Sequence, residues 1–118
     1  MAIFSVLYPS SKTKKFDHAY YDSTHIPLVR AAFKDTGLVG VLVLKGEPSA
    51  DGTPPPFVAM AHFAFESPEA LQASITGPRA AEVFADVKAF TTIKPVTQVS
   101  QRAPSRPAEP VVEASAEH

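Results

Sequence analysis

The segment Phe16–Val29, FDHAYYDSTHIPLV, collects most of the candidate chemical groups of this chain on one predicted helix. Pro27 has no N–H to donate to the carbonyl of Ser23, so the turn that leads from Ser23 to Ile26 must kink or find other partners. A helix over about residues 17–34, broken by Pro27, is therefore the element around which we predict the rest of the fold.

Strand-like patterns precede and follow this helix. A short apolar run comes before it, and a β-branched run, VGVLVL, comes after Gly37, where we expect the helix to end. A turn-rich loop with three successive prolines then separates two apolar runs and predicts a hairpin. The expected strands are Ile3–Tyr8, Val39–Leu44, Phe57–Phe65 and Lys94–Arg102, with the first buried on both faces and the last at an edge of the sheet.

The second half of the chain carries the signals of two short helices or one broken helix. Ser67 can cap the first turn, in which Pro68 loses nothing by lacking an N–H. Gly77 and Pro78 divide the helical pattern, which resumes and continues to about Lys88. The order β-α-β-β-α-β predicts an α+β, ferredoxin-like domain with a four-stranded antiparallel sheet.

Both faces of the third predicted strand are largely apolar. Alternate residues form two sets, with Phe57, Ala59, Ala61, Phe63 and Phe65 in one and Val58, Met60, His62 and Ala64 in the other. Helices can cover only one face, and the other would expose an apolar patch of roughly several hundred Å², which soluble monomers rarely tolerate. We therefore expect a homodimer whose sheets pack face to face.

Two blocks of the sequence resemble a known family. The more specific pattern, FD..YY...H.PL, is formed by Phe16, Asp17, Tyr20, Tyr21, His25, Pro27 and Leu28. A weaker late block contains Asp86, Phe90 and Thr91. With a first strand that ends in Leu7-Tyr8-Pro9 and a PP pair before the third strand, the chain resembles the EthD family over about residues 3–101.

The resemblance implies a dimeric α+β barrel, the same architecture that the patterns predict. Relatives of the EthD family include cofactor-free lactone isomerases, polyketide-tailoring enzymes and quinone-forming oxygenases. Related dimeric barrels include heme proteins with a histidine ligand, and an absorption spectrum would identify such a protein. The resemblance thus implies an architecture, no required cofactor, and several possible reactions.

Composition limits the partners further. A chain of 118 residues, 45% of them hydrophobic, suits one domain over residues 1–102, followed by a Pro/Ala/Glu-rich tail over residues 103–118 that we expect to be flexible. A net charge of −1 gives no field for nucleic acid or an anionic membrane, and no apolar run is long enough to span a bilayer. The lack of cysteine and of a signal-peptide pattern favours the cytoplasm.

His25 is the first candidate for catalysis. Imidazole titrates near neutral pH and can both accept and donate a proton, which enolisation, isomerisation or dehydration of a carbonyl compound requires. A histidine at a helix break can equally be a structural residue. The match of His25 to the H.PL pattern favours a functional role.

Tyr20 and Tyr21 are the candidates for stabilising a developing anion through a phenol hydroxyl. Adjacent helix positions diverge by about 100°, so only one of them is expected to face the pocket. Asp22, three residues before His25, can orient the imidazole ring, as carboxylates often do. The plainer interpretation makes the tyrosines core-edge residues and Asp22 an exposed acid, and Asp17 is expected to be a helix cap.

The remaining candidates lie farther along the chain. His62 is either a core histidine bonded to a backbone carbonyl or part of a pocket wall opposite His25. Phe90 and Thr91 belong to the late block with Asp86, which resembles a helix end and turn that close the cavity. We therefore take Asp22, His62, Phe90 and Thr91 as candidate substrate-binding residues.

A metal site is not expected. His18, Asp22 and His25 have tempting spacing, but seven residues of helix rise about 10 Å, too far for two histidines to share one zinc ion. The chain also lacks the HExxH, phosphate-loop and dinucleotide fingerprints.

Two hypotheses follow. In the first, the protein is a cofactor-independent enzyme, of isomerase/lyase or oxygenase/oxidoreductase type, that acts on a small apolar carbonyl, lactone or phenolic compound with His25 as acid or base. In the second, it is a non-catalytic small-molecule-binding accessory protein of a degradation pathway.

Overall fold

The computed structural model describes residues 1–102, and the tail expected over residues 103–118 lies outside the described part. One antiparallel sheet of four strands has the order β2-β3-β1-β4, which places β4 at an edge as expected. Its strands are β1 (Ala2–Pro9), β2 (Leu38–Lys45), β3 (Phe57–Phe65) and β4 (Val96–Gln101). The predicted hairpin is the antiparallel pair of β2 and β3. This α+β, ferredoxin-like architecture confirms the predicted fold class.

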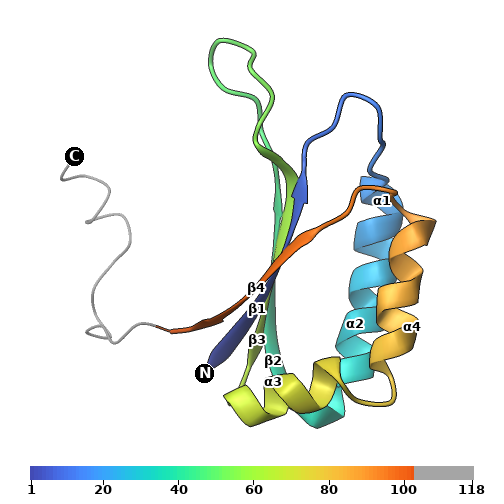
Figure 1. The fold of residues 1–118 in the computed structure, drawn as a ribbon, viewed down its shortest axis with the longest axis vertical. Coiled ribbons are helices and arrows are strands. Elements are labelled where there is room, and N and C mark those ends of the chain that lie inside the picture. The colour runs from blue at the N-terminus through green and yellow to red at the C-terminus, as the bar shows by residue number, and fades with distance from the viewer. Residues whose placement is uncertain (103–118) are drawn as a thin grey trace, which may run out of the picture.

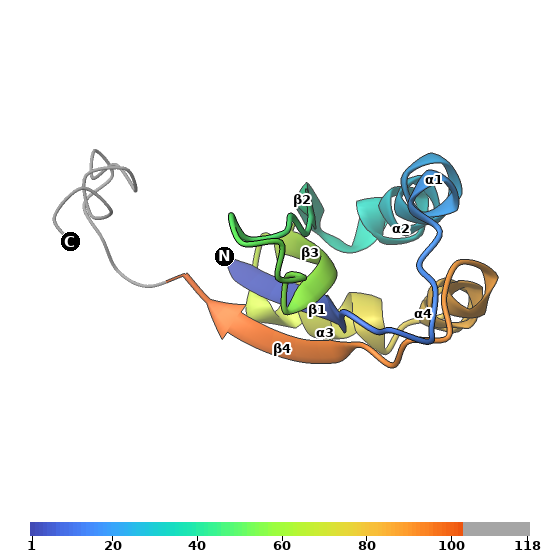
Figure 2. The same ribbon diagram turned by 90° about the horizontal axis from the view of Figure 1, so that it is seen from above.

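Helices cover one face of this sheet (Figure 1). The first crossover consists of α1 (His18–Tyr20), a π-helical turn η1 (Tyr21–His25), α2 (Ile26–Phe33) and a 3₁₀ turn η2 (Lys34–Thr36). The second consists of α3 (Pro68–Ile75), α4 (Ala80–Ala85) and a 3₁₀ turn η3 (Asp86–Ala89). Seen from above, α2 and α4 lie side by side on the same side of the sheet (Figure 2). Within residues 1–102, no helix has both the length and the apolar character needed to cross a bilayer.

The break expected before Pro27 is a π-helical turn. The Ile26 N–H donates to the carbonyl of Tyr21, five residues earlier, so the turn is wider than an α-helical one. Pro27 then occupies the first turn of α2, where its missing N–H costs little. The wide turn aligns Tyr21 with His25, and their rings stack with centroids 5.6 Å apart. π-Turns of this kind are frequent at functional sites.

Local signals in the sequence set the other helix ends. The Asp17 side chain accepts from the Tyr20 N–H, and the Ser67 side chain accepts from the Ala70 N–H, so both predicted caps are confirmed. Gly37 follows η2 with a φ of 108°, a left-handed conformation that favours glycine. α3 ends and α4 begins on either side of Gly77 and Pro78.

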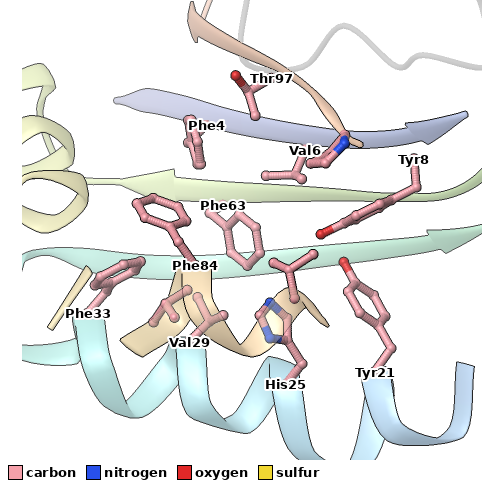
Figure 3. Close-up of a pocket in the computed structure, with 13 residues that line it drawn as sticks. Phe4, Val6, Tyr8, Tyr21, His25, Val29, Phe33, Phe63, Phe84 and Thr97 are labelled. Carbon is pink, nitrogen blue, oxygen red and sulfur yellow. The ribbon is translucent and has the colours of Figure 1, made fainter. Parts of the chain in front are cut away.

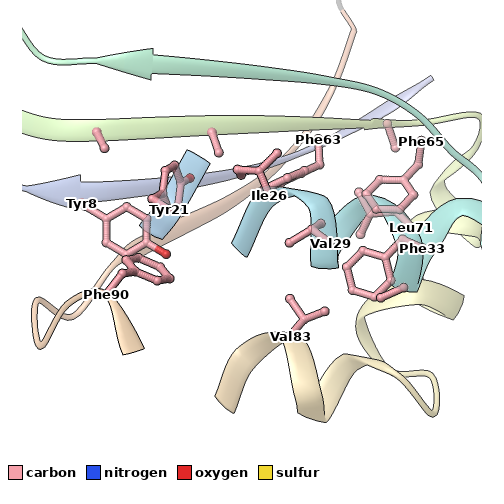
Figure 4. Packing of buried hydrophobic residues seen from close by; sticks show 14 of the residues in the cluster. Tyr8, Tyr21, Ile26, Val29, Phe33, Phe63, Phe65, Leu71, Val83 and Phe90 are labelled. Atoms are coloured by element: carbon pink, nitrogen blue, oxygen red, sulfur yellow. The ribbon is translucent and has the colours of Figure 1, made fainter. Parts of the chain in front are cut away.

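The hydrophobic core lies between the helices and the sheet (Figure 4). It is built from one alternating set of β3 side chains and from the inward faces of the helices. Its members include Ala61, Phe63 and Phe65 of β3, Ile26, Val29 and Phe33 of α2, Leu71 of α3 and Val83 of α4. Each large apolar side chain buried here contributes roughly 1.5–3 kcal/mol. The core therefore holds α2 and α4 against the sheet and fixes the position of η1.

The opposite face of the sheet, which we call the outer face, is largely apolar. Strand register brings Leu42 beside His62 and His62 beside Ser5, and the next row brings together Leu44, Met60 and Leu7. No helix within residues 1–102 lies over this face (Figure 1). Leu42 is 56% exposed there. Within residues 1–102 the helices therefore cover one face of the sheet alone, and the expectation that β1 is buried on both faces depends on what covers the outer face.

Candidate active site

A cavity opens between the helices and the inner face of the sheet (Figure 3). It has a volume of about 70 Å³, and nearly all of its lining atoms are apolar. Strand residues form one wall, and residues of η1, α2, α4 and η3 form the other. The lining residues are Phe4, Val6, Tyr8, Phe63, Pro95 and Thr97 on the sheet side, with Tyr21, His25, Val29, Phe33, Val83, Phe84 and Val87 on the helix side. This volume is well below the roughly 300–1,000 Å³ of typical ligand pockets, so the cavity as it stands can hold only one end of a ligand.

His25 is the polar centre of this cavity. The π-turn carries its ring into the space between helix and sheet, where the residue is 4% exposed. Its Nδ1 lies 2.9 Å from Oδ2 of Asp86, which begins η3 after α4. Phe90 packs against the ring with a centroid separation of 4.6 Å, and Tyr21 stacks on it. The ring is thus fixed on two faces and on one edge.

The bond to Asp86 determines the tautomer of His25. A carboxylate can only accept, so Nδ1 carries the hydrogen and Nε2 keeps its lone pair. Burial lowers the pKa of His25, and the hydrogen bond and charge of Asp86 raise it only in part, so the pKa lies below its ordinary value. At neutral pH the imidazole is therefore uncharged and able to accept a proton at Nε2.

Asp86 connects two of the residues predicted from the sequence. Its Oδ1 accepts from the Tyr20 hydroxyl at 2.7 Å, and its Oδ2 bonds to His25. Partial burial raises the pKa of Asp86, but the hydrogen bonds from His25 and Tyr20 outweigh it and keep the pKa below the usual value. The bond to Asp86 raises the pKa of Tyr20, which stays a neutral donor. Tyr20 is therefore engaged with Asp86 and is not part of the cavity lining.

Tyr21 and Tyr8 place hydroxyls at one end of the cavity (Figure 3). Both side chains are 1% exposed, and burial raises the pKa of both phenols, so they stay protonated donors. Within residues 1–102, neither hydroxyl forms a hydrogen bond with the protein. Every fully buried side-chain nitrogen or oxygen there has a hydrogen-bond partner, so these two hydroxyl oxygens must keep some accessible surface. The two hydroxyls therefore face the cavity. Of the two predicted tyrosines, the structure brings Tyr21 to the pocket.

Two candidates lie away from this cavity. Asp22 is exposed on η1, and the carboxylate at the His25 ring is that of Asp86. The prediction that Asp22 orients His25 is therefore wrong, because the wide turn directs Asp22 to solvent. His62 projects from the outer face of β3, where its Nδ1 lies 2.7 Å from Ser5 Oγ. It is neither a pocket wall nor bonded to a backbone carbonyl, because its strand neighbours Ala61 and Phe63 take the inner face.

Phe90 and Thr91 support the site without lining it. Phe90 is 3% exposed and lies behind His25 and Tyr21. The Thr91 hydroxyl donates to the Lys15 carbonyl at 2.7 Å and accepts from the Ile93 N–H, which ties the chain after η3 to the loop before α1. None of Asp86, Phe90 and Thr91 lines the cavity, so the expectation that the late block closes it stays a prediction, and Phe90 and Thr91 lie outside the first layer of residues around the cavity.

Sequence reasoning underestimated two residues. Asp86 was available in the late block, but nothing in the sequence shows that it meets His25, 61 positions earlier. Tyr8 ends an apolar strand and gives no pattern beyond its place before Pro9. In residues 1–102, no group of three or more His, Cys, Asp or Glu side chains is close enough to hold a metal ion.

Comparison with known proteins places this geometry in a family. The family model of the EthD domain matches residues 10–94. A comparison with curated protein sequences gives no significant match.

Several solved structures share the fold. An EthD-like protein from Ralstonia eutropha is 36% identical, covers 92% of this chain and 96% of its own, and has a TM-score of 0.81. An EthD family protein from Bacillus halodurans is 20% identical over 87% of this chain and 99% of its own, with a TM-score of 0.69. SnoaB from Streptomyces nogalater, a cofactor-independent oxygenase, is 13% identical over 90% of this chain and 96% of its own, with a TM-score of 0.63.

Proposed function

The chain belongs to the EthD family, and on that premise we propose that it is a cofactor-independent enzyme that removes a proton from a small apolar carbonyl, lactone or phenolic compound. The single observation that carries the proposal is the hydrogen bond between buried His25, which lines an apolar cavity, and partly buried Asp86. A neutral imidazole with a free Nε2, held in one tautomer by a carboxylate, is suited to act as a general base.

In the proposed reaction, Nε2 of His25 takes a proton from the carbon next to the substrate carbonyl, or from a phenol. The negative charge that develops on the substrate oxygen accepts hydrogen bonds from the Tyr8 and Tyr21 hydroxyls, which face the same cavity. The imidazolium that forms is stabilised by Asp86. The protonated Nε2 can then return the proton to a different substrate atom, which completes an isomerisation or elimination.

The oxygenase variant uses the same first step. A phenol that has lost its proton is electron-rich and can react with dioxygen as the second substrate. Support for this variant is architectural, because SnoaB, a cofactor-independent oxygenase, shares the fold at 13% identity.

A non-catalytic role in binding is the second candidate. It is favoured by a lining that is apolar apart from His25, Tyr8, Tyr21 and Thr97 and so offers few groups for chemistry. Under this hypothesis the same pocket holds an apolar ligand, and His25 serves only as a hydrogen-bonding partner.

Proton exchange distinguishes the two candidates. The protein is incubated in D₂O with a panel of small lactones and cyclic ketones, and deuterium incorporation next to the carbonyl is followed by NMR. We expect exchange with the wild-type protein and a loss of about 10²–10⁴-fold in His25→Gln. An oxygen electrode with dihydroxylated aromatic compounds tests the oxygenase variant in the same pair of proteins.

His62→Gln is the matched control, because His62 lies on the outer face of the sheet and should leave exchange unchanged. Ligand binding measured by NMR in His25→Gln confirms that the pocket is intact. Binding without exchange or oxygen uptake in the wild-type protein would contradict the enzymatic proposal and leave the binding role.

The outer face supports a second part of the proposal, a homodimer. Leu42 and Val96 are 56% and 51% exposed there, beside partly buried Met60 and Leu7. The same face of a second copy, related by a two-fold axis, would cover these side chains, as in a dimeric barrel.

A further inference from the structure

A second cleft lies outside the cavity of His25. It has a volume of about 310 Å³ and is bounded by the loop between β1 and α1 and by the loop of the β2–β3 hairpin. Both loops rise from the same end of the sheet in Figure 1. No residue lines both this cleft and the cavity of His25. Phe16, which lines the cleft, packs edge-on against Tyr8 and Tyr21, which line the cavity, so an aromatic layer separates the two.

All ionisable side chains that line the cleft are basic. Lys14 comes from the first loop, His18 from α1 and Lys45 from the end of β2. Within residues 1–102, neither lysine forms a salt bridge. Burial and the positive charge of Lys45 lower the pKa of His18, while Asp22 and Asp17 raise it in part. Lys45 is therefore close enough for its field to act on His18 across the cleft.

The rest of the lining combines an apolar floor with hydroxyl groups. Phe16, Val58 and Ile93 provide the floor, and Ser10 and Ser11 provide the hydroxyls. The Ser10 N–H donates to the Pro56 carbonyl at 2.9 Å, which joins the two loops that form the walls. Gly46 permits the two arms of the β2–β3 hairpin to approach each other closely, because a side chain there would collide with the Phe57 carbonyl. A backbone hydrogen bond therefore holds the two walls of the cleft together.

We propose that this cleft binds a small organic carboxylate, with the apolar body on the floor of Phe16, Val58 and Ile93 and the carboxylate between Lys14 and Lys45. Two lysines that line one cleft, neither in a salt bridge within residues 1–102, attract an anion, and an apolar floor selects one that carries a hydrophobic body. The site is separate from the proposed reaction, so its ligand is either a second compound or a regulator.

The test uses benzoate as the probe and benzyl alcohol as its neutral counterpart. NMR of the histidine rings of the full chain follows both titrations. We expect benzoate to perturb His18 more than His25 and to raise the pKa of His18, while benzyl alcohol binds at least about threefold more weakly. Lys14→Met and Lys45→Met should each weaken benzoate binding by about threefold to fivefold.

Lys34→Met is the matched control, since Lys34 is exposed in η2 and does not line the cleft. It should bind benzoate as the wild-type protein does. Equal affinity for benzoate and benzyl alcohol, equal effects of the three lysine variants, or perturbation confined to His25 would overturn the proposal. Inorganic phosphate that binds as tightly as benzoate would overturn the choice of an organic carboxylate.

Discussion

His25 faces the inner side of the sheet from η1, whereas His62 lies on the outer face, and the difference between the two shows what makes a histidine a candidate reagent. His25 and His62 both bond through Nδ1 to an oxygen on another element, at 2.9 and 2.7 Å. The partner of His25 is a carboxylate, and its ring lines a cavity with two phenol hydroxyls. The partner of His62 is the Ser5 hydroxyl on a face that lacks a covering helix within residues 1–102. The Nδ1 hydrogen bond is therefore similar in the two histidines, and the surroundings of the ring make the difference between them.

The largest expected effect concerns the outer face. Leu42→Asp places a carboxylate at the proposed dimer contact, where its strand neighbour His62 is already bonded through Nδ1 to Ser5 and the new charge would be buried. We expect the dimer to weaken by more than about 100-fold, because an unpaired buried charge costs several kcal/mol. Sedimentation measures the change. Leu42 is exposed in the monomer, so the fold should persist.

Val39→Asp serves as the control, since Val39 is similarly exposed on β2 but lies at the bulge where the pairing with β3 shifts. If the wild-type protein sediments as a monomer, or Leu42→Asp dimerises as well as Val39→Asp, the outer face is not the dimer contact.

The next effect concerns the inner face. Asp86→Asn removes the charge that holds the His25 tautomer and should lower turnover by about 10–100-fold. Asp86 raises the pKa of His25, so the variant should titrate His25 at a still lower pH. In the wild-type protein the base form is lost as pH falls through that lowered pKa, so activity should persist below the ordinary histidine value and then decline. pH–rate profiles and NMR titration of the ring measure both changes.

Asp22→Asn is the matched control, because Asp22 is the carboxylate that spacing along the helix suggested. Its exposed position predicts unchanged turnover and an unchanged pKa of His25. Equal losses in the two variants would show that Asp86 does not position the ring.

The sequence carried enough local information to predict the elements and the break. Pro27, Gly37, Ser67 and Gly77 act on their own turns, so their effects can be read without knowing the tertiary fold. Strand alternation likewise divided the β3 residues into two sets, one of which forms the core in the structure, but it did not show which set that would be. These predictions depend on hydrogen bonds and periodicity over fewer than about ten residues.

The site could be predicted only in part, for two physical reasons. The spacing that placed Asp22 on the same face as His25 assumes an α-helix. A π-turn changes which side chains share a face, so Asp22 is directed outward and Tyr21 inward. His25 lies in the first crossover and Asp86 in the second, and the sheet brings the two crossovers together. No local sequence pattern predicts this contact. His62 was ambiguous because the register that sends it outward depends on which set of β3 side chains the helices cover.

The smallest expected effect is that of Tyr20→Phe, and its comparison with Tyr21→Phe separates the two neighbouring tyrosines. Tyr20→Phe removes one of two donors to Asp86 and should lower turnover by about twofold to tenfold, because the carboxylate still holds His25. Tyr21→Phe removes a hydroxyl that faces the cavity, where loss of one donor to a developing anion costs about 10²–10³-fold. The ratio of the two losses, measured on one substrate, distinguishes a positioning residue from one that contacts substrate. A greater loss in Tyr20→Phe would mean that the Asp86 network, and not the pair of cavity hydroxyls, stabilises the transition state.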